Sequence, residues 1–387
     1  MASTTKPARR FSHVRLENWR NFKTVEVDLQ KRVFLYGPNA SGKSNFLDVF
    51  RFLREIVLDG GGFVHAVEQR GGVSKLRCLS ARRYPEIGVK VRVATNGDGV
   101  IWEYGLRFTQ DNQRRSVIKQ ERIVKDGKEI LRRPNCDDKR DPEQLRQTHL
   151  EQVLVNREFR ELADFFRSVS YFHIVPQLVR DPEKYRGRAN DPFGWDLLSR
   201  ISGTPEKTRN AWLRRIREAL KATVSQLNDL ELMTDRRGVP HLRGRFEHWR
   251  PQGAWQTEEM FSDGTLRLLG LLWATLEGAG PLLLEEPELS LHTEIVRQIP
   301  ALLARMQSRT GRQVLVSSHS PELLSDTGVA LDEVLLLEPS AEGTTLRRAA
   351  GVKEIQKLHE CGISLAEAVS ARTRPEGADQ LPLFGHG

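Results

Sequence analysis

The stretch that decides the fold is Gly37-Pro-Asn-Ala-Ser-Gly-Lys-Ser44. It matches the phosphate-loop pattern G-x-x-x-x-G-K-S/T in full. It follows an apolar run at residues 32–36 and precedes a stretch of helical spacing from residue 43 to about residue 56. A strand that leads through a glycine-rich turn into a helix presents backbone N–H groups and a helix N-terminus to a phosphate. We therefore predict a nucleotide site in which Lys43 contacts the β- and γ-phosphates and the Ser44 hydroxyl is a ligand of Mg²⁺.

A pair of acids follows a second apolar run, Leu282-Leu-Leu-Glu285-Glu286. At the end of a buried strand, Glu285 is expected to hold Mg²⁺ directly or through water, and Glu286 to polarise the attacking water as general base. The first acid of such pairs is usually Asp, so the longer Glu285 is expected to shift the metal or to weaken its binding. The alternative is an ordinary buried strand with a solvated acidic end.

Two further segments carry residue types suited to a phosphate. Residues 262–265, Ser-Asp-Gly-Thr, stand at the start of an apolar helical stretch, where small residues favour an anion site, although Ser262 also fits a plain helix cap. His319 ends the apolar run that follows the paired acids, where we expect it to contact the γ-phosphate and the attacking water. A lone histidine is otherwise more often structural.

These four motifs, together with Trp19-Arg-Asn-Phe22, resemble the ABC-type ATPases of the RecF/SMC/OLD group within the bacterial AAA family ATPase class. The resemblance covers residues 14 to 50 and 260 to 325. It implies that ATP and Mg²⁺ are the cofactors, that Ser44 and Glu285 serve the metal, that Glu286 is the catalytic base and that His319 is the switch residue. The nucleotide-binding residues that it implies are Gly37, Pro38, Asn39, Ala40, Ser41, Gly42, Lys43, Ser44 and Asn45.

The resemblance also implies a homodimer, or a higher oligomer, that closes around ATP. In this group a signature segment, here Ser262, Asp263, Gly264 and Thr265, completes the nucleotide site of the partner subunit. Residues 289–292 would form the D-loop across the dimer. A glutamine lid contacts the metal; Gln177 suits this role, with Gln69 as the alternative.

The order of the apolar runs predicts an α/β fold, an ABC-ATPase head with a mostly parallel core sheet, an antiparallel β subdomain and an inserted helical arm. An antiparallel pair of strands is expected at residues 11–29 and a second small β unit at residues 87–125, with a loop at 128–145. A mainly helical stretch is expected to follow as far as about residue 232. A single helix is expected at residues 293–307. The expected domains are 1–140 (first part of the ATPase core), 141–259 (helical insertion lobe), 260–350 (second part of the core) and 351–387 (C-terminal helix and flexible tail).

Composition narrows the class of protein further. The chain has 387 residues, a net charge of +9 and three widely spaced cysteines, and it contains no apolar run long enough to cross a membrane. These features favour a cytoplasmic protein without membrane contact. Arginine pairs are scattered along the chain rather than clustered, so DNA stays open as a partner. Gln380-Leu-Pro-Leu-Phe384 resembles the short peptide that binds the bacterial sliding clamp, although a random apolar tail fits too.

Two roles remain after a transporter subunit and a long coiled-coil SMC protein are set aside. The favoured role is a sensor or regulator in bacterial anti-phage defence whose effector, such as a Toprim nuclease, is encoded separately. The alternative is a RecF-like DNA repair or recombination ATPase that binds DNA directly.

Overall fold

The computed structural model describes residues 8–80, 85–95, 99–182, 193–247 and 254–373. These ranges leave out the tail motif at 380–384. The chain divides into two compact units, each described here by itself. The first comprises Met1–Ser170, Ala279–Leu283 and Pro300–Gly387, and the second comprises Tyr171–Gly278 and Leu284–Ile299.

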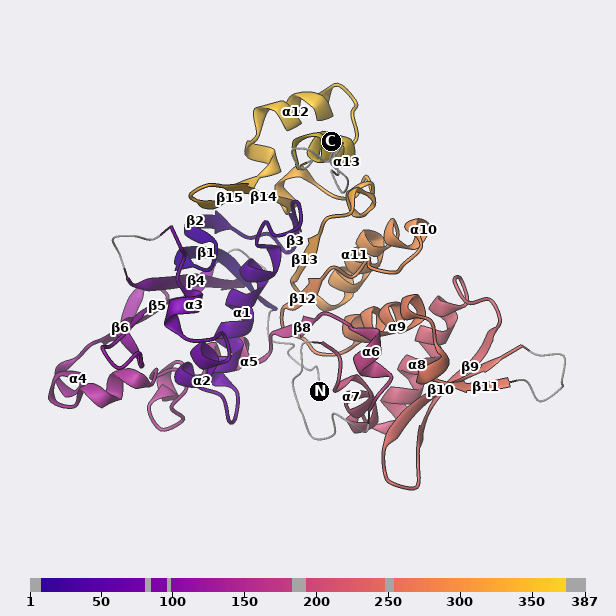
Figure 1. The fold of residues 1–387 in the computed structure, drawn as a ribbon, viewed down its shortest axis with the longest axis horizontal. Helices are drawn as coiled ribbons and strands as arrows, with labels where there is room; N and C mark the ends of the chain where they lie inside the picture. The colour runs from indigo at the N-terminus through magenta and orange to yellow at the C-terminus, as the bar shows by residue number, and fades with distance from the viewer. Residues whose placement is uncertain (1–7, 81–84, 96–98, 183–192, 248–253, 374–387) are drawn as a thin grey trace, which may run out of the picture. The chain divides into compact units, whose positions relative to one another are not determined.

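An antiparallel sheet of six strands forms one half of the first unit, in the order β2-β1-β4-β5-β6-β7 (Figure 1). Its strands alternate buried apolar and exposed polar residues, which gives the sheet one core face and one solvated face. The strands are β1 (Arg9–Trp19), β2 (Phe22–Asp28), β4 (Ile87–Thr95), β5 (Val100–Gln110), β6 (Ser116–Lys125) and β7 (Lys128–Arg133).

The expected loop at 128–145 is wrong, because this segment begins with strand β7 and continues into helix α4 (Cys136–Arg140). Asp126 and Gly127 both have positive φ, 48° and 79°, which is the geometry of a tight hairpin between β6 and β7. Arg133 at the end of β7 is fully buried and pairs with Glu121 and Asp138. The polar composition of β7 concealed the strand.

The core sheet has the strand order β15-β14-β3-β13-β12-β8. Within the first unit, β3 lies between β13 and β14 and is parallel to both, and β15 adds an antiparallel edge. The mostly parallel core that the sequence predicts is thus present. The strands are β3 (Arg32–Tyr36), β8 (Ser170–Phe172), β12 (Leu282–Glu285), β13 (Val314–Ser318), β14 (Val334–Ser340) and β15 (Gly343–Arg348).

Helix α1 (Lys43–Val57) is confirmed within one residue of the predicted end, and ten of its residues are buried. Its aromatic side chains pack with those of β1, as in the pair Phe11 and Phe50, whose ring centroids are 4.7 Å apart. The other helices of this unit are α2 (Phe63–Glu68), α3 (Val73–Leu76), α4, α5 (Arg160–Arg167), α11 (Ile299–Thr310, except its first residue), α12 (Lys353–Glu360) and α13 (Leu365–Thr373).

The second unit combines helices with a three-stranded antiparallel sheet of order β11-β10-β9. The helical stretch expected to reach residue 232 stops at Leu220, and Leu227 begins a strand. Trp212 of α8 packs edge-on against Trp273 of α9, with centroids 5.1 Å apart. The elements are α6 (Pro176–Val179), α7 (Leu197–Gly203), α8 (Glu206–Leu220), β9 (Leu227–Thr234), β10 (Pro240–Phe246), β11 (Ala254–Thr257), α9 (Asp263–Leu276) and α10 (Thr293–Val296).

The single helix expected at 293–307 is two helices, α10 and α11 (Ile299–Thr310). The break falls just before Pro300, which occupies the first turn of α11. Proline is tolerated there because its missing N–H has no intrahelical partner at that position. Among the described residues, no helix is long and apolar enough to cross a membrane.

Candidate nucleotide-binding site

The phosphate loop connects β3 to α1 in the first unit, and its backbone needs glycine at two places. Gly42 has φ 96°, and a β-carbon there would lie 2.0 Å from the Asn21 side chain. A β-carbon on Gly37 would lie 2.6 Å from the carbonyl oxygen of Leu337. Both glycines therefore fit the close packing that a phosphate cradle requires.

The N-terminus of α1 opens onto this loop. Gly42 is the N-cap, and no side chain caps the helix, so its first backbone N–H groups can bind an anion. The Lys43 ammonium is almost fully buried and donates to the carbonyl oxygens of Gly37 and Pro38 at 2.9 and 3.0 Å. The loop thus brings a helix N-terminus and a lysine charge to one place.

Asn21 holds the loop from the side, and sequence reasoning missed its contribution. Its amide donates to the carbonyl oxygen of Ser41 at 2.9 Å and to the hydroxyl of Thr344. Asn45 donates to the Asn21 side-chain oxygen at 2.8 Å, and Thr344 also donates to the Ser41 carbonyl at 2.9 Å. Asn21 lies within the Trp19–Phe22 motif, and this motif could have indicated its contribution to the site. Thr344 lies outside every motif.

His319 follows β13, which pairs with β3 in parallel so that Ser318 is opposite Tyr36. Since the phosphate loop follows Tyr36, His319 and Gly37 leave neighbouring parallel strands at the same edge of the sheet. The His319 side chain is exposed there. The first unit therefore brings the predicted nucleotide-binding residues and the predicted switch residue to one edge.

The paired acids lie in the second unit, at the end of β12. Tyr171 of β8 donates its hydroxyl hydrogen to the Glu285 carboxylate, and His173 Nδ1 lies 3.3 Å from the Glu285 carbonyl oxygen. Burial lowers the pKa of His173, against the opposing effect of that backbone hydrogen bond. Glu286 has φ 43°, a left-handed conformation that is uncommon for a residue other than glycine. Tyr171 and His173 were not predicted from the sequence.

The signature segment begins α9 in the same unit. The Ser262 hydroxyl accepts the Thr265 N–H at 3.2 Å, so the plain capping role is present. The residues expected to form the D-loop contact the segment, because a β-carbon on Gly264 would lie 2.6 Å from the carbonyl oxygen of Ser290. This contact connects two segments that are both expected to face a partner subunit.

The two candidate lid residues lie in different units. Gln177 is on α6, and its amide nitrogen lies 3.4 Å from the Asp263 carboxylate, whereas Gln69 is exposed after α2. Arg180 donates to Asp263 at 2.5 Å and to the Phe261 carbonyl at 2.7 Å. Gln177 therefore lies beside the signature segment of its own chain.

With this geometry established, comparison with known proteins identifies the family. Residues 32–325, more than half of the chain, match the family described as "AAA domain, putative AbiEii toxin, Type IV TA system". The chain belongs to this family. The resemblance drawn from the motifs is confirmed at the level of the family: the protein has the AAA domain of a P-loop ATPase.

Members of wider groups resemble this AAA-domain protein more distantly. The endonuclease GajA from Bacillus cereus (strain VD045) is 37% identical over 54 residues, which is 14% of this chain and 9% of GajA. An SMC head bound to the C-winged helix domain of ScpA aligns with TM-score 0.53 and 15% identity over 87% of this chain and 96% of its own. An SMC head with an extended coiled coil, bound to the C-terminal domain of ScpA from Pyrococcus furiosus, aligns with a TM-score of 0.51 and 11% sequence identity. This alignment covers 92% of this chain and 100% of the SMC head. These structures confirm the predicted ABC-ATPase head fold.

Within the described part of this AAA-domain chain, no group of three or more His, Cys, Asp or Glu residues could hold a metal ion. Ser44 of the first unit offers a hydroxyl and Glu285 of the second unit a carboxylate, and each is a type of ligand that Mg²⁺ accepts. Magnesium in nucleotide sites is commonly held by one or two such oxygens, with phosphate oxygens and water as the remaining ligands.

Proposed function

We propose that this chain hydrolyses ATP to ADP and phosphate and that two copies close around the bound nucleotide. The observation that carries the proposal is the phosphate loop, in which Gly42, the N-terminus of α1 and Lys43 form an anion cradle. Bound Mg²⁺ would neutralise charge on the β- and γ-phosphates, with Ser44 and Glu285 as its protein ligands.

The remaining residues have roles that follow from their chemistry. Glu286 would polarise the attacking water, since a carboxylate can accept the proton that the water loses. His319 would contact the γ-phosphate, in keeping with its exposed position beside the phosphate loop. The signature segment of the partner would supply an N-capped helix terminus to the γ-phosphate, and Gln177 would act as the lid.

The experiment that tests this proposal uses Glu286→Gln, which keeps the shape of the side chain but removes its basicity. We expect the variant to bind ATP, to hydrolyse it at least 100-fold more slowly than the wild type, and to form a stable dimer with ATP and Mg²⁺ in light scattering. The matched control, Glu286→Gln with Lys43→Ala, should stay monomeric because the phosphate cradle has lost its charge. A Glu286→Gln protein that remains monomeric with saturating ATP would contradict the dimer.

We further propose that the ATPase acts as a sensor or regulator in anti-phage defence, with a separately encoded effector such as a Toprim nuclease. Two comparisons support this role. The description of the family names a toxin of a toxin–antitoxin system, and a short segment of the chain matches an endonuclease. The test is phage challenge of cells that carry the native locus, with wild-type protein or Lys43→Ala. Equal plaque counts for the two would count against a defence role.

A further inference from the structure

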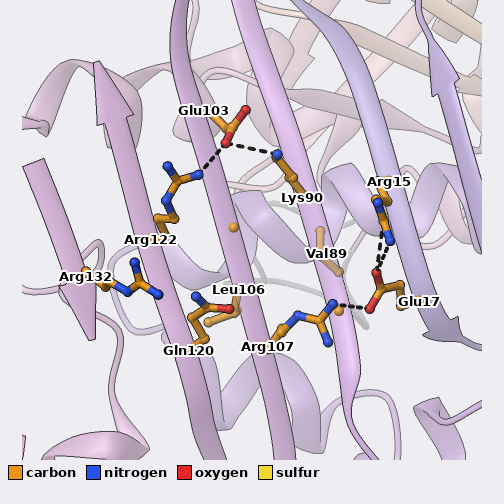
Figure 2. A pocket seen from close by; sticks show the side chains of 12 residues that line it. Arg15, Glu17, Val89, Lys90, Glu103, Leu106, Arg107, Gln120, Arg122 and Arg132 are labelled. Carbon is orange, nitrogen blue, oxygen red and sulfur yellow. Dashed lines mark hydrogen bonds and ion pairs between the residues drawn. The ribbon is translucent and has the colours of Figure 1, made fainter. Parts of the chain in front are cut away.

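A hollow lies on the solvated face of the antiparallel sheet in the first unit, and none of the site residues named above lines it (Figure 2). Outward-pointing side chains of β1, β4, β5, β6 and β7 surround it. Gly105 occupies the floor, and a β-carbon there would meet no atom within 4 Å. The residues that line the hollow are Arg15, Glu17, Gly88, Val89, Lys90, Glu103, Gly105, Leu106, Arg107, Gln120, Arg122 and Arg132.

The strand register places four cations in one row across five strands. Each residue of the row is directly opposite the next, and the only member without a side chain is the central glycine. The row is Arg15, Lys90, Gly105, Arg122 and Arg132. With neighbouring strands about 4.8 Å apart, the row is about 19 Å long.

Arg15 is directly opposite Lys90, and Arg122 is directly opposite Arg132; like charges in such positions destabilise a sheet unless carboxylates pair with them. Two carboxylates, Glu17 and Glu103, lie between the cations (Figure 2). Burial of Glu103 raises its pKa, but hydrogen bonds from Lys90 and Arg92 outweigh burial and leave that pKa below its usual value. Glu103 is therefore ionised at neutral pH and holds its cationic neighbours in place.

The carboxylates lie deeper than the cations. The side chains of Glu17 and Glu103 are 19% and 16% exposed, whereas those of the lining cations are 36% to 67% exposed. Five cations line the hollow against two carboxylates, and Glu26 and Glu129 outside the lining pair with Arg15, Arg122 and Arg132, so one positive charge remains in excess. Arg132 is the most exposed of these side chains, so a ligand that approaches the row meets its guanidinium first, which favours an anion.

We propose that this row binds the sugar-phosphate backbone of a nucleic-acid duplex. At 3.4 Å of helix axis per phosphate on one strand, a row of this length can face about five phosphates. None of the described lining residues is aromatic, so the face has no platform on which an unpaired base could stack. Arginine and lysine contacts to phosphate carry no sequence information, so binding is independent of sequence.

The first experiment compares two charge reversals by fluorescence anisotropy with a 20-base-pair DNA duplex of mixed sequence at low salt, without nucleotide. Arg132 and Arg140 are exposed arginines of the same unit, with side chains 67% and 82% exposed, and only Arg132 lines the hollow. We expect Arg132→Glu to weaken binding about tenfold and to lower the salt slope by about one. Arg140→Glu should change binding less than twofold.

A second variant tests the hollow without changing charge. Gly105→Val places a branched side chain between Lys90 and Arg122, suits a strand, and has open space at the β-carbon. It should retain the wild-type melting temperature and weaken duplex binding at least threefold. Because no ATP is present in either assay, these results do not depend on the proposed ATPase activity.

Three outcomes would overturn the proposal. They are equal effects of Arg132→Glu and Arg140→Glu, unchanged binding by a folded Gly105→Val protein, and equal or tighter binding of a 20-nucleotide single strand. The first would mean that only net charge attracts DNA, and the second that the hollow is not used.

Discussion

Tyr171 donates a hydrogen bond to the carboxylate of Glu285, the residue that stands where related motifs carry the shorter aspartate. Tyr171 is the middle residue of β8 and Glu285 is the last residue of β12, and both lie in the second unit. A carboxylate on a longer side chain has one more rotatable bond, and a hydrogen bond from a fixed tyrosine restricts it. Tyr171 is thus suited to help fix the orientation of the carboxylate that we propose as a metal ligand.

Tyr171→Phe should therefore weaken the binding of the Mg²⁺ that ATP hydrolysis requires. We expect the Mg²⁺ concentration for half-maximal activity to rise about tenfold, since a hydrogen bond to a charged group contributes about 1.5–3 kcal/mol. Mn²⁺ binding in the presence of ATP, followed by electron paramagnetic resonance, should weaken in parallel. The control is Tyr104→Phe, which removes a buried tyrosine–carboxylate hydrogen bond of the antiparallel sheet. If the Mg²⁺ concentration for half-maximal activity rises tenfold in the control as well, the effect comes from a loss of protein stability and not from the Glu285 carboxylate.

Asn21→Ala should weaken ATP binding without preventing folding. The substitution removes the side-chain contacts to Ser41, Asn45 and Thr344 that fix the phosphate loop. We expect ATP affinity, measured by isothermal titration calorimetry, to fall about tenfold, which corresponds to about 1.4 kcal/mol. Asn18→Ala removes a side-chain hydrogen bond to Glu86 in the same sheet and should leave ATP affinity within twofold. Wild-type affinity in Asn21→Ala would show that the loop keeps its shape without this residue.

Gly264→Ala should impair the ATP-dependent dimer while leaving ATP binding by the monomer intact. A β-carbon at this position lies 2.6 Å from the Ser290 carbonyl, so the signature segment or residues 289–292 must move. Light scattering in the Glu286→Gln background should show at least a tenfold higher dissociation constant. The control is Gly203→Ala on α7, where the β-carbon has open space and alanine is the better helix former. An unimpaired dimer with Gly264→Ala would exclude this segment from the interface.

Acid should destabilise the protein through His173. Its pKa is lowered by burial, so the unfolded chain binds more protons than the folded one below the ordinary value of 6.5. The stability that neutral His173 contributes is therefore complete above about pH 6.5 and is lost as the pH falls toward the folded pKa. His173→Gln should flatten the loss of thermal stability between pH 7.5 and 5.5, whereas His359→Gln on exposed α12 should not. Identical pH profiles for wild type and His173→Gln would contradict this assignment.

Local patterns in the sequence were sufficient for the fold wherever one physical signal dominated. The pattern from Gly37 to Ser44 predicts the strand before it, the phosphate loop and the start of α1. The glycines, the lysine and the spacing of the flanking apolar residues all indicate this same strand–loop–helix structure. Strand β7 was missed because Lys128–Arg133 is polar, and its pairing depends on a turn with positive φ. Pro300 was accepted inside a helix, although its ring is compatible only with a first turn.

Parts of the site could not be derived from local patterns, because they join residues far apart in the chain. Thr344 contacts Asn21 from 323 residues away, and Tyr171 contacts Glu285 from 114 away. No spacing rule connects such positions, and their side chains have common structural roles elsewhere. The roles of Glu286, His319 and Gln177 stay predictions, because they depend on a bound nucleotide and on a partner subunit.

The position of β3 between β13 and β14 has a consequence for synthesis on the ribosome. The strand that carries the phosphate loop leaves the exit tunnel long before its two neighbours, since both are encoded after residue 313. A nascent chain must therefore keep this loop beside an unpaired strand until β13 and β14 have been made. The complete nucleotide loop, with a neighbouring strand on each side, forms only after that point of synthesis.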